Sequence, residues 1–262
     1  MTARTAHLPI KLPDDATDVV VAGPRPFVTD VRYTLPDGSR HHWEARRHRK
    51  EAGGRGAHSL TWRIGLLFVI GSACFVAGPI PFYVNLVGTR GAAWTFFIGS
   101  IFFTSAAYLS YVQVVREDGH RWFGWTPHLM GFWATLIQLV GTLYFNATTF
   151  RSLQDVPPEM VNQVIWRPDA FGSICFLISS AIAFGEAGHR WWSWRPGHLD
   201  WHVTALNMWG SVFFGLSAIG AFTEPSGTLR NAVVANVGTS VGAVCFLIAA
   251  LLTMGEEAPR ES

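Results

Sequence analysis

Two segments of the sequence bring together side chains that could bind charged groups. The segment Glu117–Pro127 reads EDGHRWFGWTP, the segment Glu186–Pro196 reads EAGHRWWSWRP, and the two match at seven of eleven positions. Arginine offers a planar fork that suits phosphate or carboxylate groups, and tryptophan favours the head-group layer of a membrane. The pattern therefore predicts a site for a lipid head group or an anionic solute. Its residues are Glu117, His120, Arg121, Trp122, Glu186, His189, Arg190 and Trp191.

The same two segments have a second interpretation that needs no ligand. Tryptophan and arginine at a membrane surface act as an interfacial anchor. The glutamate of each segment can also form an ion pair with an arginine of the same chain. This interpretation is the simpler of the two, and the sequence leaves both open.

Other patterns of reactive residues are weak or absent. His198 and His202 are four residues apart, so on a helix their rings would lie on one face, but the sequence contains neither His-Glu-x-x-His nor Cys-x-x-Cys. The pair is therefore a weak candidate for zinc or haem, and we expect no cofactor. The sequence also lacks a Ser-His-Asp arrangement, a P-loop and paired catalytic carboxylates. We therefore expect a protein that is not an enzyme.

The distribution of charge indicates the elements that must position these side chains. Charged residues make up 15% of the 262 residues, and residues 1–63 are polar and basic. The rest of the chain contains six runs without Asp, Glu, Lys or Arg. Because about 20 apolar residues cross a bilayer as a helix, these runs predict an all-α membrane protein with six transmembrane helices. The runs are 64–89, 91–115, 122–150, 170–185, 201–223 and 231–255.

A short pattern recurs in every run. It consists of glycine, a small residue, any residue, cysteine or an aromatic residue, and then phenylalanine. The glycines of alternate runs are 69 to 73 residues apart, which predicts a helical hairpin repeated three times about a pseudo-threefold axis. We expect these glycines, and the cysteines of the pattern, to lie where helices pack closely. The glycines are Gly71, Gly99, Gly141, Gly172, Gly210 and Gly242.

The predicted organisation has three parts, namely an N-terminal arm of residues 1–62, a transmembrane domain of residues 63–255 and a tail of residues 256–262. The hairpins are expected at 63–116, 129–187 and 203–255. In the arm, Val31–Leu35 and His41–Ala45 flank a turn-forming Pro-Asp-Gly-Ser sequence, which predicts a small β-hairpin. The excess of arginine and lysine in the arm places both termini in the cytoplasm, in a multi-pass protein of the cell membrane.

Polar residues inside the predicted helices are candidates for a solute path. Gln138 and Asn207 are 69 residues apart and occupy equivalent positions in their hairpins, so both are expected to face the interior of the bundle. Asn146 is a third candidate. Polar groups inside a membrane mark either hydrogen bonds between helices or a path for a solute.

The first hairpin resembles the YrhK-like membrane domain family, a pair of transmembrane helices that each carry a Phe-hydrophobic-Ile-Gly-Ser-x-x-Phe motif. The matching stretches are FVIGSACF at 68–75 and FIGSIFF at 97–103, and the second lacks one hydrophobic residue of the motif. The resemblance covers roughly a fifth of the chain and implies a helical hairpin without an assigned activity. The chain is also similar to uncharacterised six-helix membrane proteins of high-GC bacteria, which implies a bacterial origin.

These patterns predict an integral membrane protein with a non-enzymatic role, structural or stress-related, whose partner is the lipid bilayer. The charged, tryptophan-containing cluster His42–Arg49 is expected to contact anionic lipid or to serve only as an orientation signal. A formal charge of +2 gives no indication of nucleic-acid binding. Two alternatives are a small-solute channel or transporter with a path past Gln138 and Asn207, and a metal or haem protein that uses the histidines. The sequence does not predict whether the chain forms a homo-oligomer.

Overall fold

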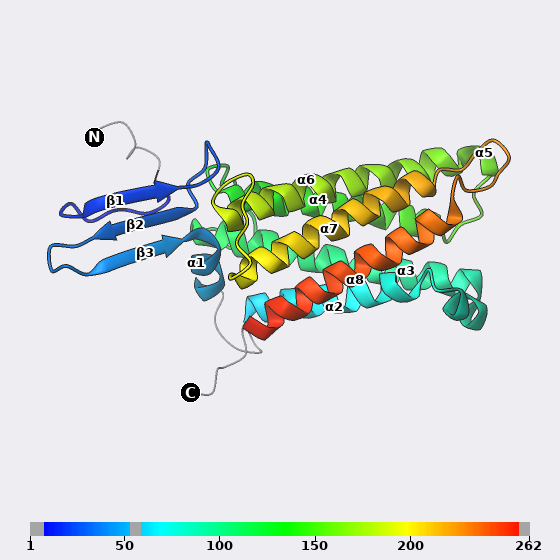
Figure 1. Cartoon of the computed structure of the whole chain (residues 1–262). Helices are drawn as coiled ribbons and strands as arrows, with labels where there is room; N and C mark the ends of the chain where they lie inside the picture. The colour runs from blue at the N-terminus through cyan, green and yellow to red at the C-terminus, as the bar shows by residue number, and fades with distance from the viewer. Residues whose placement is uncertain (1–7, 53–58, 257–262) are drawn as a thin grey trace.

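The computed structural model describes residues 8–52 and 59–256, without the side chains of Ala52 and Glu256. The predicted tail therefore lies outside the described residues, except for the backbone of Glu256. The chain is mostly helical, at 67%. Figure 1 shows a bundle of long helices with a small sheet beyond one end of it, and the short helix α1 between the sheet and the bundle. We call residues 8–52 the N-terminal region and the end of the bundle beside it the near end.

The long helices form where the sequence has its charge-free apolar runs. Among residues 8–52 and 59–256, five helical stretches are long and apolar enough to cross a membrane, and these are Leu60–Ala77, Pro81–Glu117, Pro158–Gly188, Leu199–Gly220 and Ala232–Gly255. This confirms the prediction of apolar helices of membrane-spanning length, although helix α4 (Met130–Arg151) is not among the five. The bundle helices are α2 (Leu60–Ala77), α3 (Pro81–Glu117), α4 (Met130–Arg151), α6 (Arg167–Gly188), α7 (Leu199–Gly220) and α8 (Ala232–Glu256). The short helix α5 (Pro158–Val161) and a π-helical turn (Asn162–Trp166) lead into α6.

The bundle helices form a closed ring. Helix α2 contacts α3 and α8, and the remaining neighbours are α3 with α4, α4 with α6, α6 with α7, and α7 with α8. The motif glycines lie where paired helices approach each other. A Cβ atom on Gly71 would lie 3.0 Å from the carbonyl oxygen of Gly99, and a Cβ on Gly210 would lie 3.0 Å from that of Gly242. Such spacing leaves no room for a side chain, so glycine permits the close approach.

The motif phenylalanines fill the axis of the ring. Phe75, Phe145 and Phe214 contact one another with ring centroids 5.8–6.5 Å apart. Phe103, Phe176 and Phe246 form a second triangle with centroids 5.8–6.3 Å apart. The two triangles join through pairs within α2–α3, α4–α6 and α7–α8 at 5.1–5.4 Å, mostly edge to face. We call these six side chains the phenylalanine layer, and all six are buried.

The N-terminal region folds as an antiparallel sheet followed by α1. The strands β1 (Thr17–Ala22), β2 (Asp30–Thr34) and β3 (Arg40–Glu44) lie in that order, and α1 (Ala45–Ala52) follows β3 directly. The β2–β3 pair corresponds to the hairpin predicted from the Pro-Asp-Gly-Ser turn, where Asp37 accepts hydrogen bonds from the backbone and the hydroxyl of Ser39. The first strand, β1, was not predicted from the sequence.

Candidate functional site

Helix α1 places basic side chains against carboxylates at the near end of the bundle. Arg49 is buried, with its Nη2 atom 2.6 Å from Oε1 of Glu186 and its Nε atom 3.3 Å from Oε1 of Glu117. The Glu117 contact is an ion pair that lacks the geometry of a hydrogen bond. Gly131 makes room for this guanidinium, because a Cβ atom there would collide with it. The two equivalent glutamates of the duplicated segments therefore share one arginine from a distant part of the chain.

Two further basic residues of α1 complete the cluster. Arg46 lies 3.6 Å from Oε2 of Glu186 and 3.3 Å from Oδ1 of Asp200, and Nζ of Lys50 lies 2.7 Å from the same Asp200 oxygen. Burial opposes the charge of Arg49, but the carboxylates of Glu186 and Glu117 outweigh it and raise the pKa of Arg49 above its ordinary value. Arg49 thus stays charged. Together, Arg46, Arg49 and Lys50 face the carboxyl groups of Glu117, Glu186 and Asp200. We call these six residues the charge cluster.

His189 joins the bundle to the sheet. Its Nδ1 atom lies 2.9 Å from Oγ1 of Thr29, and its Nε2 atom lies 3.2 Å from Oε1 of Glu44 and 3.9 Å from Oδ2 of Asp30. The hydrogen bond from His189 lowers the pKa of Glu44, although partial burial acts in the opposite direction. His189 is therefore a docking contact between the N-terminal region and α6.

The structure separates the remaining predicted residues of the duplicated segments. His120, Arg121 and Trp122 are exposed at the surface, and the guanidinium groups of Arg116 and Arg121 lie 5.3 Å and 5.7 Å from the centre of the Trp122 ring. Arg190 is exposed, and so is Trp191, with 54% of its surface accessible. Only the glutamates of the two segments meet, through Arg49, and the predicted eight-residue site does not converge at one point.

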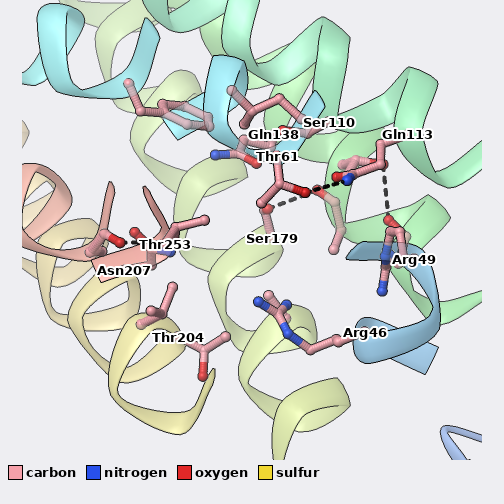
Figure 2. Close-up of a pocket in the computed structure, with 18 of the residues that line it drawn as sticks. Arg46, Arg49, Thr61, Ser110, Gln113, Gln138, Ser179, Thr204, Asn207 and Thr253 are labelled. Carbon is pink, nitrogen blue, oxygen red and sulfur yellow. Dashed lines mark hydrogen bonds between the residues drawn. The ribbon is translucent and has the colours of Figure 1, made fainter. Parts of the chain in front are cut away.

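A cavity of about 170 Å³ lies inside the bundle, directly beneath the charge cluster. Figure 2 shows Arg46 and Arg49 on one side of it and hydroxyl and amide side chains from several helices around it. Gln113 donates a hydrogen bond of 2.8 Å to Oγ1 of Thr61. The polar residues of its wall are Thr61, Ser110, Gln113, Thr135, Gln138, Ser179, Thr204, Asn207 and Thr253.

Gln138 and Asn207 have free side-chain amides in this cavity. In the described part of the chain, neither amide group makes a hydrogen bond, and both residues are partly accessible. A polar group without a protein partner is satisfied by water or by a ligand. The cavity is therefore polar enough and large enough to hold several water molecules or one small organic molecule, since a cavity of about 150 Å³ accommodates benzene.

The cavity ends at the phenylalanine layer. Phe246 contributes to both the cavity wall and the layer, and Phe68 packs against the layer from the cavity side. Asn146, which follows Phe145 of the layer, does not line the cavity, and its buried Oδ1 atom has no hydrogen-bond partner among the described residues. The three residues predicted to line a solute path thus divide into Gln138 and Asn207, which lie in the cavity, and Asn146, which does not.

The weak metal candidates have separate partners. His198 lies 3.3 Å from a guanidinium nitrogen of Arg195, and Nε2 of His202 lies 2.7 Å from the carbonyl oxygen of Pro196. Within residues 8–52 and 59–256, no group of three or more His, Cys, Asp and Glu side chains is arranged to hold a metal ion.

Sequence reasoning did not identify the partners that the N-terminal region supplies, namely Arg46, Arg49 and Lys50 for the carboxylates and Thr29 and Glu44 for His189. A signal for the first set was present. Glu186 follows an apolar run directly, Glu117 follows one after Arg116, and a carboxylate at the end of a buried helix requires a cation. The basic cluster was the obvious source, but it was assigned to lipid or to an orientation signal.

Comparison of the chain with models of protein families, with curated proteins and with solved structures gives no match.

Proposed function

We propose that this chain is a non-enzymatic, polytopic protein of a bacterial cell membrane, with six spans arranged as three hairpins about a pseudo-threefold axis. The two triangles of the phenylalanine layer support the threefold arrangement, because each triangle takes one ring from each hairpin. Helix α4, although more polar, takes the same place in the ring as α2 and α7. The basic charge of the N-terminal region supports a cytoplasmic near end.

The walls of the cavity follow the same repeat. In α2, α4 and α7, the residues three positions before the motif glycine line the cavity, and these are Phe68, Gln138 and Asn207. The residues seven positions before the same glycines also line it, namely Ile64, Ala134 and Val203. In α3, α6 and α8, the lining residues stand eleven positions after the motif glycine, and these are Ser110, Ala183 and Thr253. The cavity therefore lies on the proposed axis, and each hairpin contributes to its wall.

The function that this geometry supports best is binding and passage of a small, uncharged polar solute. The free amides of Gln138 and Asn207 in the wall of this cavity carry this proposal. An ion would need an uncompensated opposite charge beside it, whereas the basic residues of the wall are all paired with carboxylates. Amide and hydroxyl groups instead offer donors and acceptors to a solute such as glycerol or urea.

The cavity is bordered by residues of α1 at the near end and by the phenylalanine layer beyond it. Passage of a solute along the proposed axis therefore requires the phenylalanine layer to open. A purely structural membrane role, which the sequence patterns predicted ahead of a solute path, does not require free amides around a cavity. That role becomes the conclusion if no solute passes.

The proposal is tested by solute flux through the full chain reconstituted in liposomes. Stopped-flow light scattering measures the entry of glycerol and of urea, and a fluorescent reporter measures chloride as the charged comparison. We expect faster entry of at least one neutral solute than in protein-free liposomes, and no chloride flux. The double variant Gln138→Leu, Asn207→Leu should abolish the increase, because it removes the free amides from the cavity.

The matched control is Asn146→Leu. This variant removes an amide from α4, the helix that carries Gln138, but from a position outside the cavity. This variant should keep the flux of the wild type. A rate equal to that of protein-free liposomes for both neutral solutes, or an equal loss in the control and the double variant, would show that the cavity is not a solute path.

A further inference from the structure

A second hollow lies outside the bundle, between the sheet and the segment that connects α6 to α7. It has a volume of about 500 Å³, and its wall includes Arg32 of β2 and the side chains of Arg190, Trp192, Trp194 and Arg195. The docking contact between His189 and Thr29 forms part of its base. We call this hollow the arginine groove, and it shares no residue with the wall of the central cavity.

The arginine groove carries an excess of positive charge. Arg190 makes no hydrogen bond or ion pair within the described part of the chain. Arg195 contacts the carbonyl oxygen of Ala187 at 3.5 Å and the ring of His198, but no carboxylate among the described residues. The lining contains one carboxylate, Asp30, which lies 3.2 Å from Arg32. Two guanidinium groups thus remain without a counter-charge.

A buried hydroxyl adds a hydrogen-bonding group without a protein partner. Ser193 belongs to the lining of the groove, and its Oγ atom is buried with no hydrogen-bond partner among the described residues. A buried hydroxyl without a partner costs free energy, and an oxyanion in the groove could accept its hydrogen bond after a small rotation. Arginine forks and a hydroxyl together form a typical donor set for phosphate oxygens.

Exposed tryptophans place the groove at the level of the membrane surface. Trp192 is 83% exposed and Trp194 is 77% exposed, both at the near end of the bundle. Tryptophan of this exposure is costly in water and is typical of the layer where lipid head groups meet the hydrocarbon. The hydrocarbon chains of a lipid would follow the outer face of α6, where Leu177 and Ile178 are exposed.

From this arrangement we propose that the arginine groove binds a phosphate group, with Arg190 and Arg195 as its main ligands and Ser193 as a donor. The phosphodiester of an anionic phospholipid is the source that the neighbouring tryptophans favour. This site is independent of the proposed solute path, because it lies at the surface and uses different residues.

The first duplicated segment supplies a matched control. Arg121 stands at the position equivalent to Arg190, but it lies over the ring of Trp122 together with Arg116. Thr126 stands where the second segment has Arg195, so the second arginine of the groove is missing there. The first segment therefore has the same local sequence around its arginine without the groove.

The experiment measures binding to the full chain in a neutral detergent by microscale thermophoresis. The probes are dioctanoyl phosphatidylglycerol, dioctanoyl phosphatidylcholine, glycerol 3-phosphate and inorganic phosphate. We expect phosphatidylglycerol to bind more tightly than phosphatidylcholine, and Arg190→Gln to weaken its binding about tenfold through loss of a charge-assisted contact. Arg195→Gln should act in the same direction, whereas Arg121→Gln should change binding less than about twofold.

Each remaining outcome supports or overturns the proposal. Binding of glycerol 3-phosphate as tight as that of phosphatidylglycerol, with the same loss in Arg190→Gln, supports the phosphate site and assigns it to a soluble ligand. No binding of any of the four probes, or equal weakening in Arg190→Gln and Arg121→Gln, overturns it. Equal thermal unfolding midpoints of wild type and Arg190→Gln exclude misfolding as the cause, and Arg190 is exposed.

Discussion

The two duplicated segments have nearly the same sequence but contact different parts of the molecule. In the second, the imidazole of His189 is 9% exposed and contacts Thr29 and Glu44 of the N-terminal region. In the first, the imidazole of His120 is 43% exposed, and its Nε2 atom lies 4.0 Å from Oδ2 of Asp118. The N-terminal region therefore contacts the histidine of the second copy and leaves the histidine of the first exposed, while its Arg49 contacts the glutamates of both copies.

The glutamate of the second segment also has closer contacts with the N-terminal region than the glutamate of the first. Glu186 forms a hydrogen bond of 2.6 Å with Arg49 and also lies 3.6 Å from Arg46, whereas Glu117 has only the ion pair with Arg49. Two segments of similar sequence thus provide matching positions, and the N-terminal region contacts one of them more closely than the other.

The largest difference is expected between the two glutamate variants. Glu186→Gln removes the carboxylate that holds the buried guanidinium of Arg49 and contacts the half-buried guanidinium of Arg46. Breaking a buried ion pair such as Arg49–Glu186 costs about 3–5 kcal/mol. Glu117→Gln removes only the weaker contact and should cost about 1 kcal/mol, the size of one ordinary polar contact. Thermal unfolding in detergent, followed by circular dichroism, compares the two. Equal shifts of the midpoint would mean that the two glutamates contribute alike.

The histidines are expected to differ by a smaller amount. His189→Ala removes two contacts with the N-terminal region and should weaken its docking by about 1–3 kcal/mol, because Thr29 and Glu44 lose a partner. His120→Ala should have no measurable effect. Limited digestion with trypsin, which cleaves after Arg32 and Arg40 of the sheet, measures how often this region opens. Similar digestion rates for the two variants would contradict the docking role of His189.

The smallest expected effect is a dependence on pH. The folded pKa of Glu44 is lowered by the hydrogen bond from His189, so this contact stabilises the docked state above the ordinary glutamate pKa of 4.5. That contribution is lost as the pH falls through the lowered folded value. The difference in thermal unfolding midpoint between wild type and Glu44→Gln should therefore shrink towards zero at acidic pH. A difference that stays constant between pH 7 and the acidic limit would refute this assignment.

Helix positions in the bundle could be predicted because a long apolar run leaves few alternatives for a chain. The hairpin expected at 129–187 corresponds to α4, which begins at Met130, and α6, which ends at Gly188. Strand β1 was missed because Thr17–Ala22 is short and lies in a polar part of the chain, where a few valines do not separate a strand from a loop. Its pairing with β2 is what stabilises it.

Only the part of the candidate site that lies at matching positions of the recurring sequence pattern could be predicted. Gln138 and Asn207 were identified through their equivalent positions, and both line the cavity. The pairing of Arg46 with Asp200 and of Arg49 with Glu186 was not predicted, because ion pairs between residues more than 130 positions apart leave no local pattern in a sequence. Only the glutamates at the helix ends indicated that a cation was needed. Asn146 was predicted to line a solute path because of its polarity alone. The phenylalanine rings beside it fill the axis at that depth.

The phenylalanine layer has a consequence for the speed of any opening. Its rings are held mostly edge to face, and each belongs to a different helix. A ring at the surface of a protein rotates in picoseconds to nanoseconds, but a ring held between the faces of its neighbours needs the helices around it to separate. Collective movements of helices take microseconds to milliseconds. An opening of the phenylalanine layer would therefore be slow and would involve all six bundle helices at once.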